Sequence, residues 1–220
     1  AEACAQQLQR ALSDCPSLTE PQVAWACVRN TQGAALLVGN SMPIRDVDRF
    51  GAPCDHGVLC LGNRGASGID GLLSTAIGAS HALSDRKVCL LVGDVSLLHD
   101  LSAFHALANA DNKLCIVVVN NGGGGIFSFL PIAQHPGLLS PWFDSRHAQG
   151  FQGVAAAFRL EYAQVATAGD LRAALGRALG NTGSSAPWLI EVQTDPQANV
   201  ELHRQLETLC QEAMARPAAP

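Results

Sequence analysis

The chain has 220 residues, of which 48% are hydrophobic and 15% are charged, a composition that excludes a disordered or fibrous protein and fits one domain of ordinary size. Its formal net charge of −5 gives no electrostatic support to a nucleic-acid partner. Since no apolar run reaches the ~20 residues of a membrane-spanning helix, no membrane span is expected. The chain begins with Ala rather than Met, which suggests processing or excision from a longer protein.

The eight cysteines predict neither a disulfide framework nor a zinc site. None of them forms a C-x-x-C pair, the usual spacing of zinc ligands. Cys60, Cys89 and Cys115 lie inside apolar, strand-like runs. We therefore interpret the cysteines as small buried residues of a protein in a reducing compartment.

Two helices and two strands are predicted in the first third of the chain. A helix over Glu2–Ser13 is followed by a second helix that begins at Thr19, a good N-cap residue, with Pro21 in its first turn. The apolar runs Ala34–Gly39 and Val58–Leu61 predict the strands.

The loops after these two strands carry polar groups that suit a carboxylate ligand. Ser41 and Arg45 follow the first strand, and Arg64 follows the second in a glycine-rich loop. An arginine on such a loop is suited to bidentate recognition of a carboxylate. The alternative is structural: Ser41 caps the next helix, Arg45 is a solvated charge, and Arg64 ties its loop to a helix C-terminus.

The stretch from residue 87 to residue 125 predicts a right-handed βαβ unit, around which we expect the rest of the fold to be built. The runs Lys87–Gly93 and Lys113–Val119 are typical of buried parallel strands. Leu97–Asn109 predicts the crossover helix between them. Another helix, over Asp70–Leu83, precedes the unit, and we expect Asp70 to occupy its start.

Asp94 and Asn121 directly follow the two strands of this unit. Parallel strands end at the same edge of a sheet, so both side chains are expected at one crevice, where open α/β sheets bind ligands. A carboxylate, an amide oxygen and glycine carbonyls suit Mg²⁺, and Gly93 lets a diphosphate approach the backbone. A strand-end cap and an ordinary Asn-Gly turn are the alternative, but the four glycines at Gly122–Gly125 favour a ligand site.

Three features beside this crevice have competing interpretations. His99 and Asp100 are neighbours on the predicted helix and point in different directions, so we favour a structural role for His99 over acid–base chemistry. Ile126–Pro131 is apolar although it lies in an exposed loop, which predicts a lining over a cofactor; ordinary packing onto the sheet is the alternative. The segment Ala133–Gly150 is expected to be a mobile connection.

The last third of the chain repeats the alternation of helices and strands. In total, about six strands alternate with helices, which predicts an α/β fold: a doubly wound parallel sheet with helices on both faces. The expected elements here are helices over Gly153–Leu160, Gly169–Leu179 and Asn199–Ala215, and strands over Glu161–Ala166 and Pro187–Gln193.

Gly93–Asp94, followed after about 25 residues by Asn120–Asn121, resembles the diphosphate–Mg²⁺ motif of thiamine diphosphate enzymes. The common motif has a third glycine where this chain has Val95. The longer strings resemble the family of 2-succinyl-5-enolpyruvyl-6-hydroxy-3-cyclohexene-1-carboxylate synthases (SEPHCHC synthases, MenD) of menaquinone and phylloquinone biosynthesis, which tolerates a non-glycine residue at this point. These strings are Gly93–Asp100, Asn120–Pro131, Asn63–Gly71 and Gly39–Arg45.

The resemblance implies a thiamine diphosphate-binding fold and a set of site residues. Ile69 is implied as the apolar wedge that holds thiamine diphosphate bent. The implied cofactor-binding residues are Gly93, Asp94, Val95, Ser96, Ile69, Asn121 and Gly123, of which Asp94, Asn121 and Gly123 bind Mg²⁺. The implied substrate contacts are Ser41, Arg45, Arg64, Ile126, Phe127 and Leu130.

The resemblance covers nearly the whole chain, residues 1–220, but only as the C-terminal diphosphate-binding domain of the synthase, without its N-terminal pyrimidine-binding and middle domains. The family reaction decarboxylates 2-oxoglutarate and adds the resulting succinic semialdehyde unit to isochorismate. The glutamate that activates the cofactor comes from the N-terminal domain of a partner subunit. No catalytic residue is therefore assigned here, the chain alone is expected to be inactive, and a homo-oligomer is expected.

Two other classes of function stay open at this point. One is another thiamine diphosphate-dependent decarboxylase or acetolactate-type synthase, which should lack the set of Ser41, Arg45 and Arg64. The other is a non-catalytic domain that binds cofactor or stabilises an assembly. The compartment would be the cytoplasm of a bacterium or the plastid of a plant or alga, where the chain could be part of a multifunctional phylloquinone-pathway protein.

Overall fold

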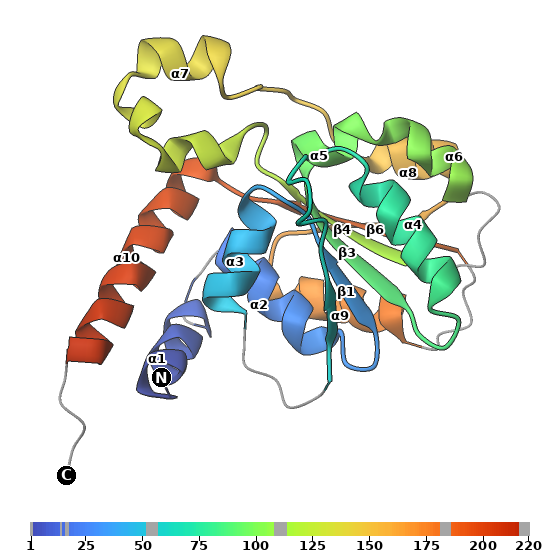
Figure 1. Cartoon of the computed structure of the whole chain (residues 1–220), viewed down its shortest axis with the longest axis horizontal. Coiled ribbons are helices and arrows are strands. Elements are labelled where there is room, and N and C mark those ends of the chain that lie inside the picture. The colour runs from blue at the N-terminus through green and yellow to red at the C-terminus, as the bar shows by residue number, and fades with distance from the viewer. Residues whose placement is uncertain are drawn as a thin grey trace.

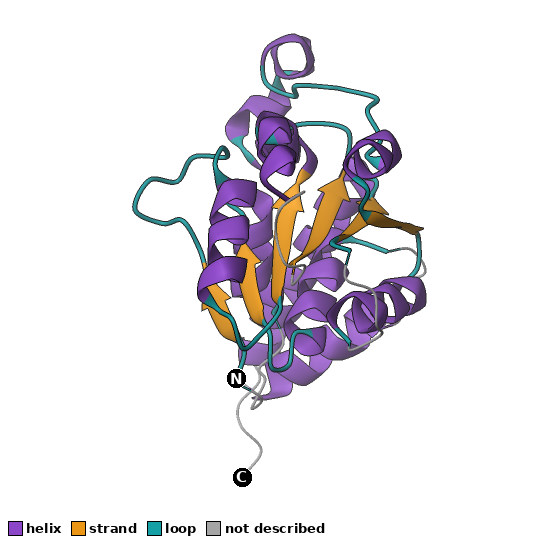
Figure 2. Ribbon diagram, turned by 90° about the vertical axis from the view of Figure 1, so that its right-hand side faces the viewer, coloured by secondary structure: helices purple, strands orange, loops and turns teal. Residues whose placement is uncertain are grey.

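The computed structural model describes residues 2–13, 15, 18–51, 57–107, 114–180 and 186–215. They form one six-stranded sheet in the order β2-β1-β3-β4-β6-β5, with every neighbouring pair parallel. Helices cover both faces of the sheet (Figures 1 and 2), so the predicted doubly wound α/β fold is confirmed. The strands are β1 (Ala35–Val38), β2 (Leu59–Leu61), β3 (Val88–Gly93), β4 (Leu114–Asn120), β5 (Glu161–Val165) and β6 (Trp188–Gln193).

The helices agree with most of the predicted ones to within a few residues. Two short 3-10 helices follow the glycine run, η2 (Gly125–Phe129) and η3 (Pro131–Gln134). The α-helices are α1 (Glu2–Ser13), α2 (Glu20–Asn30), α3 (Met42–Phe50), α4 (Leu72–Ala82), α5 (Asp94–His99), α6 (Phe104–Leu107), α7 (Pro136–Trp142), α8 (Gln152–Phe158), α9 (Ala168–Leu179) and α10 (Pro196–Ala215). None of these helices combines the length and the apolarity that a bilayer crossing requires.

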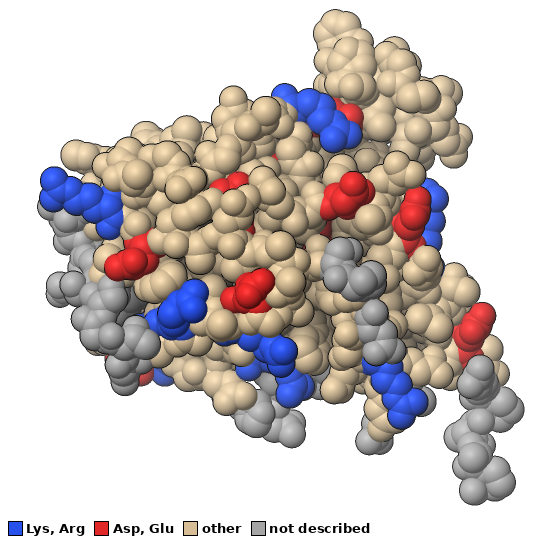
Figure 3. All heavy atoms as spheres, turned by 180° about the vertical axis from the view of Figure 1, so that it is seen from behind, with Lys and Arg blue, Asp and Glu red and all other residues tan. Residues whose placement is uncertain are grey.

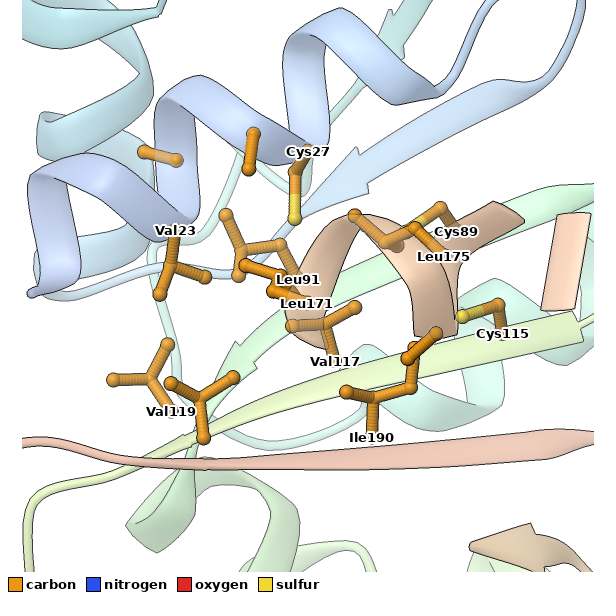
Figure 4. Close-up of a cluster of buried hydrophobic side chains, with 14 of the residues drawn as sticks. Val23, Cys27, Cys89, Leu91, Cys115, Val117, Val119, Leu171, Leu175 and Ile190 are labelled. Atoms are coloured by element: carbon orange, nitrogen blue, oxygen red, sulfur yellow. The ribbon is translucent and has the colours of Figure 1, made fainter. Parts of the chain in front are cut away.

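The central strands send alternate side chains to the two faces of the sheet, as the period of two in a strand requires. In β3, Cys89 and Leu91 pack under α2 and α9 (Figure 4). Val88, Leu90 and Val92 belong to the cluster on the opposite face, with residues of α4, α6 and α8. Side chains are buried on both faces, which explains why the strands are continuous apolar runs.

The predicted burial of the cysteines is confirmed for only some of them. Cys27, Cys89 and Cys115 are buried in the core. Cys60 is exposed, because β2 is a three-residue strand at the edge of the sheet. Cys4, Cys15 and Cys210 are half-buried, so the predicted burial was wrong for these four residues. Cys54 lies outside the described residues.

The predicted helix Leu97–Asn109 is interrupted, and residues 108–109 lie outside the described part of the chain, as does Lys113 at the start of the next predicted strand. A helix begins earlier, at Asp94, and ends at His99; a 3-10 turn, η1 (Leu101–Ala103), separates it from α6. The break falls at Asp100, whose carboxylate accepts hydrogen bonds from the N–H groups of Gly71 and Leu73, both at 2.7 Å.

The start of α4 is therefore held by Asp100 and not by Asp70, which is exposed. The prediction for Asp70 was wrong because the acceptor comes from a different loop, 29 residues away. Asp100 itself is buried, so both hydrogen bonds are shielded from water. The contact joins the Arg64 loop to the end of α5.

The segment Ala133–Gly150 is not a plain connection, because it contains the end of η3 and all of α7. Pro136 lies in the first turn of α7, where the missing N–H of proline is tolerated. In Figure 1 this segment projects beyond the sheet and its covering helices. The sequence has no Lys, Arg, Asp or Glu from Leu114 to Phe143. In the view from behind (Figure 3), the projecting part accordingly shows no charged side chains, whereas positive and negative side chains are mixed over the rest of that face.

A buried pair joins α3 to α10. His203 Nε2 lies 2.7 Å from Asp46 Oδ1, and His203 Nδ1 lies 2.8 Å from the Asn199 carbonyl oxygen. Burial lowers the pKa of His203, but the hydrogen bond and charge of Asp46 outweigh it, so the pKa lies above the ordinary value of 6.5. The imidazole also packs edge-on against Phe50 and Phe129.

We expect Asp100→Ala to lower the free energy of unfolding by about 1–2 kcal/mol, because it leaves two N–H groups at the start of α4 without an acceptor. Asp70→Ala is the matched control and should leave stability unchanged. Urea titrations of both variants measure the effect. Equal stabilities would show that Asp100 does not hold α4.

The free energy of unfolding should fall as the pH rises through the folded-state pKa of His203. A raised pKa means that the folded state keeps a proton that the unfolded state loses, so this stabilisation is complete below pH 6.5 and is lost above it. Asp46→Asn should flatten the dependence, whereas His81→Gln, at an exposed position, should not. Urea titrations across this pH range measure the direction of the change in the free energy of unfolding. A free energy of unfolding that rises with pH in the wild type, and not in Asp46→Asn, would contradict the raised pKa of His203.

Candidate functional site

A cavity of about 330 Å³ lies at the carboxyl ends of β3 and β4. Its walls come from these strand ends, the first residues of α2 and α3, the glycine run with η2, and the end of α7. This is the edge at which open parallel sheets bind ligands. Asp94 and Asn121, which the sequence predicts to meet at one crevice, both line this cavity.

Asp94 links the end of β3 to the end of β4. Its Oδ2 accepts hydrogen bonds from the N–H groups of Gly122 at 2.8 Å and Gly123 at 3.1 Å, and its Oδ1 accepts one from Val95 at 2.6 Å. His147 Nε2 lies 3.2 Å from Oδ2. Burial raises the pKa of Asp94, and these N–H groups and His147 only partly offset it. A bound cation would favour the ionised form.

The two asparagines at the end of β4 serve different purposes. Asn120 donates through Nδ2 to Glu191 Oε1 at 2.7 Å and to the Gln149 carbonyl oxygen at 3.0 Å, on the β6 side of the strand. Asn121 donates through Nδ2 to Glu20 Oε1 at 2.8 Å, and its Oδ1 is buried without a hydrogen-bond partner. A buried acceptor left in this way costs ~1–3 kcal/mol, which a cation in the cavity would offset.

The glycine run follows a path that other residues rarely adopt. Gly122 has a φ of 76° and Gly123 a φ of 153°, and a Cβ on Gly123 would overlap the Asp144 carbonyl oxygen. This path brings the Gly123 N–H against Asp94. Among the described backbone N–H groups, only that of Gly125 donates to the Gly123 carbonyl oxygen, at 3.0 Å. One of its lone pairs therefore stays available.

Asp94, Asn121 and Gly123 can thus offer one carboxylate oxygen, one orphaned amide oxygen and one carbonyl oxygen. These are hard donors of the kind that Mg²⁺ selects, and they leave coordination positions for phosphate oxygens and water. The residues present fit a divalent cation. Gly93, Val95 and Ser96 line the same cavity, and a Cβ on Gly93 would meet no atom within 4 Å, so space for a diphosphate lies beside the strand end.

The residues predicted to contact substrate do not all gather here. Ser41, Ile126 and Phe127 line the cavity, together with Ile69, whereas the remaining three predicted contacts do not. These three are Arg45, Arg64 and Leu130. Leu130 is 45% exposed.

Ser41 does not cap α3 through its side chain. It has a φ of 70°, a strained conformation for a residue with a side chain, and its carbonyl oxygen accepts a hydrogen bond from Arg45 Nη1 at 2.6 Å. Arg64 donates through Nη1 to Asn40 Oδ1 at 2.7 Å, so it ties its loop to the end of β1 and not to a helix C-terminus. Arg45 and Arg64 are both exposed.

Several cavity residues were not predicted from the sequence. Glu20 is the first residue of α2 and lines the cavity, although it lies 101 residues from its partner Asn121 in the sequence. The sequence pattern around Glu20 indicates only an acidic residue in the first turn of a helix. His99 is exposed and lines the cavity, so the expected role as a satisfied structural residue was wrong. Trp142, Phe143 and Ser145 come from the segment expected to be a connection.

Comparisons with known proteins agree with this geometry. Residues 59–192 match the family described as thiamine pyrophosphate enzyme, C-terminal TPP binding domain. The chain is 44% identical over 201 residues to the 2-succinyl-5-enolpyruvyl-6-hydroxy-3-cyclohexene-1-carboxylate synthase of Rubrobacter xylanophilus, covering 91% of the chain and 34% of the relative. The synthase of Salinibacter ruber is 39% identical over 208 residues, covering 94% and 34%. The chain thus spans about a third of the length of these relatives.

Solved structures show the same fold. A thiamine diphosphate-dependent 4-hydroxybenzoylformate decarboxylase of Rhodococcus jostii superposes with a TM-score of 0.67 at 26% identity, covering 82% of this chain and 33% of the decarboxylase. A putative thiamin diphosphate-dependent enzyme of Mycobacterium smegmatis superposes with a TM-score of 0.63 at 22% identity, covering 83% and 34%.

Asp94→Ala should reduce Mg²⁺-dependent retention of thiamine diphosphate roughly 10- to 100-fold, because contacts of a charged group are worth ~1.5–3 kcal/mol. Asp94→Asn is the sharper variant, since its one amide oxygen can still accept the N–H groups of Gly122 and Gly123, and only the contact with Val95 is lost. Equilibrium dialysis of the chain supplied with the N-terminal part of a related synthase, with and without Mg²⁺, measures retention. Asp195→Asn, after β6, is the control, and undiminished retention in Asp94→Asn would contradict a metal role.

Proposed function

Because this chain belongs to the thiamine pyrophosphate enzymes, as a C-terminal thiamine pyrophosphate-binding domain, we propose that it is the diphosphate- and Mg²⁺-binding domain of a SEPHCHC synthase. The identities of 39–44% to named synthases over 91–94% of the chain support this assignment. The single observation that carries the metal site is the buried Asn121 Oδ1 without a partner, beside Asp94 in the same cavity.

In this proposal Asp94, Asn121 and the Gly123 carbonyl bind Mg²⁺, and Gly93, Val95 and Ser96 contact the diphosphate. Thiamine diphosphate, the cofactor of the family, supplies the carbanion stabilisation that decarboxylation of a 2-oxo acid needs. Ile69, Ile126 and Phe127 form apolar walls that orient the cofactor and substrate and exclude water. The buried position of Asp94 strengthens its interaction with a cation, because little water screens the charge.

The proposed substrates are 2-oxoglutarate and isochorismate. The first loses CO₂, and the remaining four-carbon unit adds to the second. Both substrates carry carboxylates, which suits arginines on the loops after β1 and β2. Arg45 and Arg64 are the proposed carboxylate partners, with Ser41 and Leu130 contacting the substrates beside them.

The proposed synthase also contains an N-terminal pyrimidine-binding domain and a middle domain, with this chain as its C-terminal domain over residues 1–220. The lengths of the relatives, about three times that of this chain, support this organisation. A homo-oligomer is proposed in which a partner subunit supplies the activating glutamate. The free, buried thiols of Cys27, Cys89 and Cys115 support a reducing compartment, the cytoplasm of a bacterium or the plastid of a plant or alga.

A second candidate is another thiamine diphosphate-dependent decarboxylase, which the superposition on the 4-hydroxybenzoylformate decarboxylase favours. Such an enzyme would use the same metal site but would not need two arginines at the strand ends. Release of CO₂ without addition to isochorismate would identify it. A domain that binds cofactor without turnover is the third outcome.

The chain alone should not turn over 2-oxoglutarate, because the two carboxylates that line its cavity are engaged elsewhere, Asp94 at the proposed metal site and Glu20 with Asn121, and the cofactor ring would lack its activating glutamate. We expect activity when the N-terminal domains of a synthase are supplied with thiamine diphosphate and Mg²⁺. CO₂ release and consumption of isochorismate are measured in both samples. Turnover by the 220-residue chain alone would contradict the proposed division between domains.

Arg45→Ala and Arg64→Ala should each raise the KM for 2-oxoglutarate or isochorismate about 10- to 100-fold in the assembled enzyme, the equivalent of a charge-assisted contact of ~1.5–3 kcal/mol. Affinity for thiamine diphosphate should not change. Arg86→Ala is the control, since Arg86 pairs with its neighbour Asp85 before β3. Steady-state kinetics with both substrates provide the test, and unchanged KM values would mean that the two arginines are structural.

A further inference from the structure

We propose that Glu20 is a positioning residue that fixes the side-chain amide of Asn121, so that Oδ1 of Asn121 faces the cation site and Nδ2 does not. This inference rests on the proposed function of Asn121 as a metal ligand. Glu20 itself would touch neither the metal nor the substrate. Its role would be to remove one of the two orientations that a free amide can adopt.

When Glu20 is ionised, the contact between the two side chains has only one polarity. Glu20 Oε1 lies 2.8 Å from Asn121 Nδ2, and Thr194 Oγ1 donates to the same oxygen at 3.4 Å. An ionised carboxylate only accepts hydrogen bonds, whereas an amide carries donors on nitrogen and acceptors on oxygen. The nitrogen therefore faces the ionised Glu20, and the oxygen faces the opposite way, where it is buried without a partner.

Glu20 is held firmly enough to impose this orientation. It is 4% exposed and is the first residue of α2, whose start is fixed by neighbouring side chains. Gln22 Oε1 accepts the Thr19 N–H at 2.9 Å, and Gln22 Nε2 donates to the Leu12 carbonyl oxygen at 2.6 Å. One turn of α2 thus connects the end of α1 to the end of β4.

Burying the Glu20 carboxylate at this position costs free energy, because a charged group loses its hydration. Burial, and then the charge of Asp46, raise the pKa of Glu20 to about 7. The charge of Asp94 acts in the same direction, while Asn121 and His203 oppose it. A buried carboxylate beside other carboxylates is typical of functional sites, and a neutral residue would fill the same space without the desolvation cost.

The adjacent residue provides an internal comparison. Asn120 donates to Glu191 at 2.7 Å in the same way, but Glu191 also accepts from the Phe151 N–H at 2.9 Å and the Tyr162 hydroxyl at 2.7 Å. The Asn120 Oδ1 accepts the Gly122 N–H at 3.2 Å. This second pair is satisfied within the protein, so it has a structural role, and only the Glu20 pair leaves an oxygen for a ligand.

The test combines two measurements on four variants. The Asn121 side-chain amide protons are followed by ¹⁵N NMR in the 220-residue chain, and Mn²⁺ affinity with thiamine diphosphate is measured by electron paramagnetic resonance in the enzyme assembled with its N-terminal domains. Glu20→Gln keeps the shape but can pair with either end of the amide. Glu20→Asp keeps the charge but withdraws the acceptor. Glu20→Ala removes both, and Glu191→Gln is the matched control.

We expect protected Asn121 amide protons in the wild type and Glu191→Gln, and loss of that protection in all three Glu20 variants. Mn²⁺ affinity should fall about tenfold or more in these three variants and stay unchanged in Glu191→Gln. Wild-type affinity in Glu20→Asp with a loss in Glu20→Gln would mean that charge alone matters, and would overturn the positioning role. Wild-type affinity in Glu20→Ala would overturn it as well.

The outcome also separates this inference from the function on which it rests. If the wild-type enzyme binds no Mn²⁺ with thiamine diphosphate, the proposed metal site fails and the positioning role fails with it. If the wild type binds Mn²⁺ and the Glu20 variants bind it equally well, only the positioning role fails.

Discussion

The hydrogen bonds from Gly122 and Gly123 to Asp94 are the interaction on which the cavity depends. They join the ends of two adjacent parallel strands, β3 and β4, through one buried carboxylate. Strand pairing alone brings the two strand ends side by side, but it does not determine the path of the chain beyond them. The Asp94 carboxylate determines this path, because its Oδ2 accepts the N–H groups of the glycine run and so holds that run over the end of β3.

Most of this arrangement can be predicted from the sequence, because it depends on local patterns. The buried runs that become β3 and β4 are unambiguous, and parallel pairing then requires Asp94 and Asn121 to meet. The positive φ of Gly122 likewise agrees with a run of glycines after a strand. For these residues the physical cause lies within a few positions of the chain.

The features that sequence patterns did not predict all depend on contacts between distant segments. Asp100 ends a helix by binding the N–H groups of another helix, whereas its sequence neighbours continue a helical pattern. Glu20 meets the end of β4 only because α2 packs along the sheet on the face that Leu91 and Val117 share. In Arg64 the residue type suggested a ligand contact, and the structure gives it an intramolecular partner as well. Patterns of period and spacing contain no information about such partners.

The opposed directions of Asn120 and Asn121 also restrict how β4 can vary. Consecutive residues at the end of a strand face opposite sides, and here each side holds a different buried glutamate. Removing or inserting one residue within β4 would move Asn121 to the face of the sheet that holds Glu191, away from the cation site. The length of this strand is therefore constrained as tightly as its terminal sequence.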